Sequence, residues 1–233
     1  MLRQFLRFEK KSNSFLRHLS TINIRKSTSN SPKGRRLLKQ HVRSVLDDKV
    51  KLLEFIDQDT YVQKDNKFYG ASISSHIRHS LDHFKYVLTV TMNQQHNNLA
   101  DKHDHKDCLH HHKLTYDIRT RGGEVEKDLK VALKETLGMR VVVDAINVHS
   151  GVWDEQVNTE FIANSSTGES YTATSSFERE LSFVAHHATH HLAMVRVMLA
   201  ARGINLVSTS FGVANSTRVY NANQTGSKGN EEN

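Results

Sequence analysis

The residues in this chain best suited to chemistry are histidines, and many of them occur in two short clusters. The sequence contains 16 histidines; the first cluster is His76, His79 and His83, and the second is His186, His187, His190 and His191. Imidazole binds metal ions and carries protons near neutral pH, and helical bundles build metal sites from side chains on facing helices. The clusters therefore predict a metal or proton-transfer site if their helices face each other.

In the second cluster, helical phase separates one pair from its neighbours. A helix turns about 100° per residue, so His187 and His191 lie about 40° apart, beside the apolar stripe of their predicted helix. His186 and His190 point about 60–100° the other way, towards the helix flank. Because an i,i+4 pair lets two imidazoles bind one metal ion, we expect His187 and His191 to be ligands.

A third ligand has to come from another helix, and the first cluster offers it. His83 lies about 40° and His76 about 60° from His79, so all three share one arc. Three histidine ligands with open coordination positions describe a catalytic rather than a closed structural metal site. Nitrogen ligands suit zinc, nickel, iron or copper. The alternative is that these histidines border a core and are satisfied by hydrogen bonds, since the HxxxH spacing alone is not specific.

Four stretches of helical periodicity are available to position these residues. They cover about residues 38–58, 73–93, 125–137 and 176–202. Ser72 or Ser74 is the expected cap of the second, Ser175 or Ser176 begins the last, and Gly203 ends it.

Extended structure is expected before the last helix. The runs that favour it are Arg140–Ile146, Val157–Ala163 and Ser170–Thr174, with a turn at Ser166–Gly168. Residues 94–113 are rich in histidine but polar and without a period, so we predict an exposed loop that lacks a rigid metal-binding frame. The coarse prediction is four long helices and a small β-ribbon between the third and the fourth.

The net charge of +7 is concentrated at the N-terminus. Residues 1–36 contain ten of the 32 Lys and Arg residues and one of the 25 acids, so the remaining body is nearly neutral. That distribution argues against a nucleic-acid surface. The segment is also rich in Arg and Ser, with Leu2, Phe5 and Leu6 on one helical side, which predicts a mitochondrial transit peptide and a matrix location. The alternative is a basic tail on a cytoplasmic protein.

Two further features are excluded by the sequence: a transmembrane helix and an intramolecular disulfide. No apolar run approaches 18 residues, so no transmembrane helix is expected. Cys108 is the only cysteine, so an intramolecular disulfide is excluded.

Four blocks, in order, resemble the DinB-like superfamily, and most closely its bacterial members. The blocks are Ser72–Phe84, Tyr116–Asp128, Ser175–Leu199 and Phe211–Tyr220. The resemblance spans most of residues 37–220, with 94–113 as an insertion, and leaves 1–36 and 221–233 outside as a leader and a disordered tail. It implies an all-α four-helix bundle, with the ribbon inserted between helices 3 and 4. It also implies a divalent metal held by His79, His187 and His191.

The resemblance further implies a metal-dependent transferase or hydrolase. Its metal, for which zinc, nickel or iron are the candidates, would activate water or a low-molecular-weight thiol. The expected partner is a small molecule, not a nucleic acid or a membrane, and a homodimer is an open alternative. The rival hypothesis is a non-catalytic metal-binding or interaction bundle.

Four further residues are weaker candidates. His83 is a neighbour of the ligands or an alternative ligand one turn along from His79. Glu180 lies two turns before His187, where it could accept a hydrogen bond from a ligand or stabilise the helix N-terminus. Arg119 and Arg121 could hold an anionic substrate, although a structural ion-pair network is the competing explanation.

Overall fold

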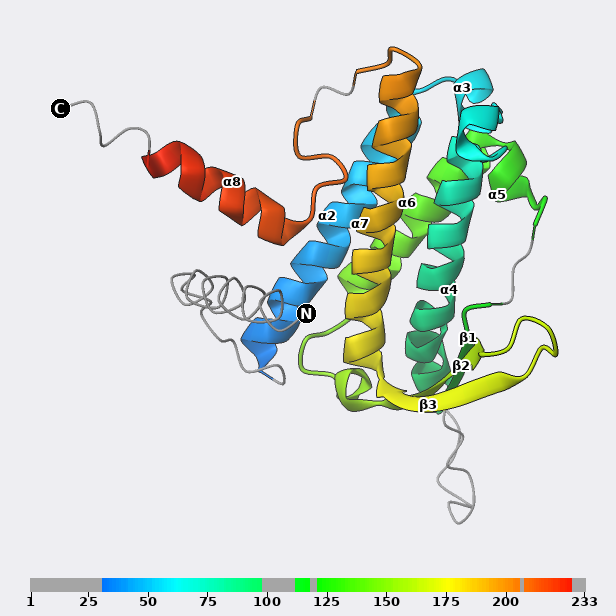
Figure 1. The fold of residues 1–233 in the computed structure, drawn as a ribbon. Helices are drawn as coiled ribbons and strands as arrows, with labels where there is room; N and C mark the ends of the chain where they lie inside the picture. The colour runs from blue at the N-terminus through cyan, green and yellow to red at the C-terminus, as the bar shows by residue number, and fades with distance from the viewer. Residues whose placement is uncertain (1–30, 98–111, 118–120, 206–207, 228–233) are drawn as a thin grey trace, which may run out of the picture.

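The computed structural model describes residues 31–97, 112–117, 121–205 and 208–227, which are mostly helical with a small three-stranded sheet. Figure 1 shows the long helices α2 (Pro32–Phe55), α4 (Ile73–Asn97), α6 (Leu129–Ala145) and α7 (Phe177–Ala201). Helix α4 packs against α7 and α6, and α2 packs against the same two helices. The shorter helices are α3 (Gln58–Val62), η1 (Asn66–Phe68), α5 (Glu124–Lys127), η2 (Gly151–Asp154) and α8 (Asn215–Ser227). The predicted helical class is confirmed.

The two histidine-bearing helices begin and end at the residues that local chemistry favours. The Ser72 hydroxyl accepts a hydrogen bond from the Ser75 backbone N–H, which caps α4. The Ser176 hydroxyl accepts one from the Arg179 N–H and caps α7. Gly203 follows α7 with φ +73° and donates to Ala200, while Ile204 donates to Leu199, so the helix ends in a Schellman motif. The predicted caps and stop are confirmed.

Helix α2 starts earlier than predicted. Ser31 caps it by accepting from the Gly34 N–H, and Pro32 occupies the first helical position, where its missing N–H has no cost. Arg35 is buried and pairs with Asp154 at 2.5 Å. Residues 31–36, which were expected to belong to a segment preceding the bundle, are therefore part of the folded body. Residues 1–30 lie outside the described part of the chain.

The third predicted helix is two helices, and the prediction that residues 140–146 are extended is wrong. Asp128 separates α5 from α6 with an extended backbone, and its carboxylate accepts from the Lys130 and Val131 N–H groups. Helix α6 then continues to Ala145, because its face that includes the buried Val143 packs against α2. The β-branched run in α6 favours strands only weakly, and packing overrides that preference.

The sheet has the order β1–β2–β3, with β1 (His112–Thr115) parallel and β3 (Ser170–Ser176) antiparallel to β2 (Gln156–Ile162). Strands β2 and β3 are the predicted ribbon, and Gly168 lies in its turn with φ +76°. Strand β1 was not predicted. It occupies the end of the segment expected to be a loop, while α4 covers residues 94–97 at the other end. Residues 98–111 lie outside the described chain.

The C-terminal region is more ordered than predicted. Helix α8 includes residues 221–227 of the expected disordered tail. Arg218 anchors α8, because its guanidinium donates to the carbonyls of Ser210 and Val213. Among the described residues, no helix combines the length and the apolar character needed to cross a membrane.

Candidate metal centre

The two histidine clusters meet along the contact between α4 and α7. These helices lie side by side and run in opposite directions (Figure 1). His76 lies against His191 with 2.9 Å between their Nδ1 atoms, and His79 lies against His187 with 3.2 Å between their Nε2 atoms. The two histidine clusters therefore lie against each other, as a shared metal site would require.

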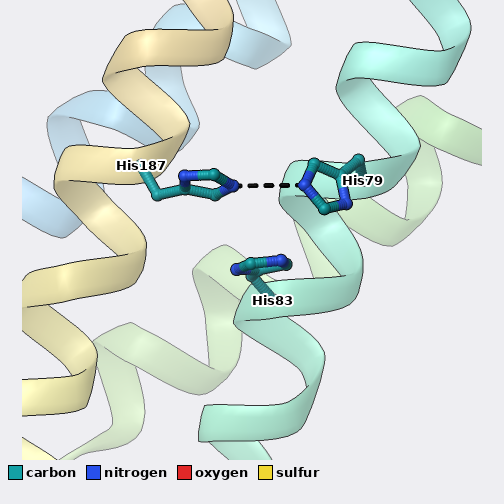
Figure 2. A group of neighbouring side chains, drawn as sticks. All are labelled: His79, His83 and His187. Atoms are coloured by element: carbon teal, nitrogen blue, oxygen red, sulfur yellow. Dashed lines mark hydrogen bonds between the residues drawn. The ribbon is translucent and has the colours of Figure 1, made fainter. Parts of the chain in front are cut away.

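Three of these side chains could hold a metal ion. His79, His83 and His187 each offer one ring nitrogen, and the three atoms all lie within 4.8 Å of one another. Figure 2 shows the imidazole of His187 directed at His79, with the ring of His83 beneath. His83 is buried, whereas the other two are half-buried.

His191 brings a fourth imidazole against His187. Its Nε2 lies 3.1 Å from the His187 Nε2, and its ring is nearly perpendicular to those of His187 and His79, at 82° and 85°. The rings of His79 and His187 are themselves at 79°. Nitrogens bound about 2.0–2.1 Å from one zinc ion at tetrahedral angles are about 3.3 Å apart. The separations from the His187 Nε2 to those of His79 and His191, 3.2 Å and 3.1 Å, match that spacing.

His83 is oriented differently from these three. Its ring is stacked on that of His187, with centroids 4.4 Å apart and planes at 20°. The lone pair of an imidazole nitrogen lies in the ring plane. Two stacked rings therefore direct their lone pairs in parallel planes rather than towards a common point. His83 also stacks on Tyr116, with centroids 4.8 Å apart, and therefore lies within an aromatic cluster.

The protonation state of His191 suits ligation. Burial, followed by the neighbouring His187, His79 and His76, lowers the pKa of His191 to about 2. Burial also lowers the pKa of His76. Both are therefore neutral imidazoles near pH 7, and a neutral imidazole is the form that binds metal ions.

Below the histidines lies a buried polar network centred on Glu180. Its carboxylate is fully buried and accepts hydrogen bonds from the Tyr116 hydroxyl, the Ser175 hydroxyl and the Arg179 guanidinium, each at 2.6 Å. Burial and the adjacent Glu180 raise the pKa of Tyr116. Glu180 is thus connected to the histidines through Tyr116, whose ring stacks on His83.

Tyr116 is the site residue that sequence reasoning missed. It follows β1, which was not recognised, and the strand carries it to the end of α7 where Glu180 lies. A signal was present in the alternation of Leu114 and Tyr116, both of which are buried. Two apolar residues are too short a pattern to define a strand by themselves.

The remaining candidates are exposed or lie outside the described residues. Arg121 is exposed, and Arg119 belongs to the undescribed residues 118–120. His186 and His190 are exposed on the flank of α7, as helical phase predicted. Beside His79, Arg78 pairs with Asp82 at 2.8 Å and with Glu126 at 2.9 Å, which ties α4 to α5.

A cavity of about 930 Å³ lies between the first turns of α2 and α7. Its lining includes Trp153, Ser175, Arg179, Phe183 and His186. Phe183 also stacks on the ring of His187, with centroids 5.6 Å apart. One side chain therefore contacts both the cavity and the histidine cluster.

Comparisons with known proteins identify no relative. A scan against models of protein families, a search of curated proteins and a search of solved structures each found no match.

Proposed function

We propose that this chain is a metal-dependent enzyme with a DinB-like four-helix bundle, in which His79, His187 and His191 hold one divalent ion. The observation that supports it best is the approach of the His187 Nε2 atom to two other Nε2 atoms, at 3.2 Å from that of His79 and 3.1 Å from that of His191. Hydrogen bonding explains this poorly. A single ring nitrogen is either one donor or one acceptor, so the His187 Nε2 cannot satisfy both neighbours equally. A shared cation would satisfy all three lone pairs.

His79 and His187 belong to every ligand set considered, and the third ligand is His191 in our proposal. Perpendicular rings allow three in-plane lone pairs to converge, whereas the stacked ring of His83 runs parallel to that of His187. The rival set therefore replaces His191 with His83. Single replacements by alanine separate the two, because only the true third ligand should be needed for tight binding of zinc.

The chemistry proposed is activation of water or a low-molecular-weight thiol. A bound divalent ion of the zinc, nickel or iron type would lower the pKa of the water or thiol that it binds. The protein groups around it have their own roles. His83 and Phe183 cover the imidazole of His187, and the cavity beside Phe183 offers volume for a small molecule. The three proposed ligands are half-buried, so they are not enclosed in the core.

The competing function is a bundle in which the same histidines are purely structural. Cobalt substitution separates the two, since the ligand field of cobalt reports on added ligands. We expect azide or a thiol to change the visible spectrum of the cobalt protein, because three protein ligands leave open positions. An unchanged spectrum at saturating azide and thiol would favour a closed, structural site.

We also propose import into the mitochondrial matrix, on the basis of the basic segment before Ser31. Because Arg35 is buried against Asp154, any cleavage compatible with the fold falls before residue 31 rather than after residue 36. Sequencing the N-terminus of the protein from mitochondria tests this. An N-terminus at Met1 or after residue 36 would contradict it.

A further inference from the structure

The contact between His76 and His191 assigns a role to a histidine that is not among the proposed ligands. Their Nδ1 atoms are 2.9 Å apart, a hydrogen-bonding distance, and both rings are half-buried. His76 lies one turn before the ligand His79 on α4. Helix α4 thus supplies both a ligand and the partner of a ligand on the opposite helix.

A contact between two Nδ1 atoms has only two proton arrangements for neutral rings. Either His191 donates and His76 accepts, or the reverse. In the first arrangement the proton of His191 is on Nδ1 and the Nε2 lone pair is free to bind a cation. In the second arrangement the proton of His191 is on Nε2, which faces His187 at 3.1 Å and cannot then be a ligand atom.

We propose that His76 is a positioning residue that accepts the Nδ1 proton of His191 and so presents the His191 Nε2 to the metal ion. This inference rests on the proposed function, because it concerns the same ion. The bond fixes the tautomer of His191 and also the rotation of its ring. Acceptors on the far nitrogen of a metal-binding histidine typically contribute 10–100-fold to metal affinity.

The other contacts of His191 do not involve an acceptor for its Nδ1 proton. His187 and His79 lie at its Nε2 side or against its ring, and His190 stacks edge-on at 5.5 Å on the exposed flank. His76 is the residue with which its Nδ1 forms a hydrogen bond within the described chain. Replacing that acceptor should therefore leave the tautomer of His191 unconstrained.

The test compares His76→Asn with His76→Leu in the full chain. The amide oxygen of asparagine occupies nearly the position of Nδ1 and can accept the same proton, whereas leucine fills similar volume without an acceptor. Zinc affinity is measured by competition with a chromophoric chelator, and His190→Leu, on the exposed flank, is the matched control. We expect zinc binding about 10–100-fold weaker in His76→Leu and within about threefold of wild type in His76→Asn.

A second readout does not involve affinity. Nitrogen NMR of the imidazoles in the zinc-loaded protein should show the proton of His191 on Nδ1. In wild type this proton should be hydrogen-bonded to the Nδ1 of His76. If His76→Leu does not fold, His76→Phe takes its place as the variant without an acceptor atom.

The possible results separate this inference from the proposed function. Equal zinc affinity in His76→Leu and wild type, or equal loss in His76→Asn and His76→Leu, would overturn the role of His76 alone. Absence of zinc binding in well-folded wild type would overturn the proposed function itself.

Discussion

A buried lysine in the core makes the fold dependent on pH in a defined window. Lys49 on α2 is fully buried, and among the described residues its ammonium nitrogen has no hydrogen-bond partner. The ammonium nitrogen instead lies over the ring of Phe84, 4.8 Å from its centroid, in a cation–π contact. Burial lowers the pKa of Lys49 from 10.5 to about 7.

The size of the effect follows from that change in pKa. At about 1.4 kcal/mol per pKa unit, lowering it from 10.5 to about 7 corresponds to about 5 kcal/mol of unfolding free energy. The folded-state pKa is below the unfolded-state pKa, so between these values the unfolded chain binds more protons. The free energy of unfolding should therefore rise with pH from about 7 to about 10.5, and the full penalty should be present below pH 7.

Urea unfolding of wild type and Lys49→Met from pH 6 to pH 10 measures this directly. Methionine keeps an unbranched side chain without a charge, so we expect the variant to be more stable near pH 6 by up to about 5 kcal/mol. The advantage should shrink steadily towards pH 10. The exposed neighbour gives the control, since Lys51→Met should change little at any pH. A difference between Lys49→Met and wild type that stays constant from pH 6 to pH 10 would refute the reasoning.

Three further predictions concern the Glu180 network and two glycines. Tyr116→Phe removes a 2.6 Å hydrogen bond to the fully buried carboxylate of Glu180 and should lower the unfolding free energy, measured by urea titration, by about 1–3 kcal/mol. The control is Tyr171→Phe, because Tyr171 is 63% exposed and its replacement should have no measurable effect in the same titration. Gly212→Ala should lower the thermal midpoint by calorimetry, because a Cβ there would lie 2.7 Å from the Ala193 backbone nitrogen and φ is +66°. Gly138→Ala in α6 meets nothing within 4 Å and should instead add about 0.5–1 kcal/mol, so a shift of the same sign in both alanine variants would contradict this account.

Much of the candidate site was predictable because helical phase is a local property. The pair His187 and His191, and the arc containing His79, follow from 100° per residue, and the caps at Ser72 and Ser176 follow from hydroxyl chemistry. The choice between His83 and His191 was not predictable in the same way. It depends on the rotation of each ring about its own bonds, which neighbouring helices determine.

The errors in the fold have a common origin in tertiary contacts. The β-branched run near Val143 reads as a strand, yet the surface of α2 stabilises it as a helix, and Lys39 donates to the carbonyls of Asp144 and Ile146 at the helix end. Strand β1 exists because β2 offers it a parallel partner more than 40 residues later in the chain. Neither effect leaves a pattern in the sequence long enough to define the element, and the failure to predict β1 concealed Tyr116.

The stoichiometry of bound metal shows whether His187 helps to hold a metal ion. The purified full chain is loaded with zinc, freed of loosely bound ions by gel filtration with a weak chelator, and measured by elemental analysis beside His187→Ala and the flank control His190→Ala. We expect about one zinc ion per chain in wild type and in His190→Ala, and almost none in His187→Ala. A folded wild type without zinc, or a His187→Ala variant that keeps a full complement, would contradict it.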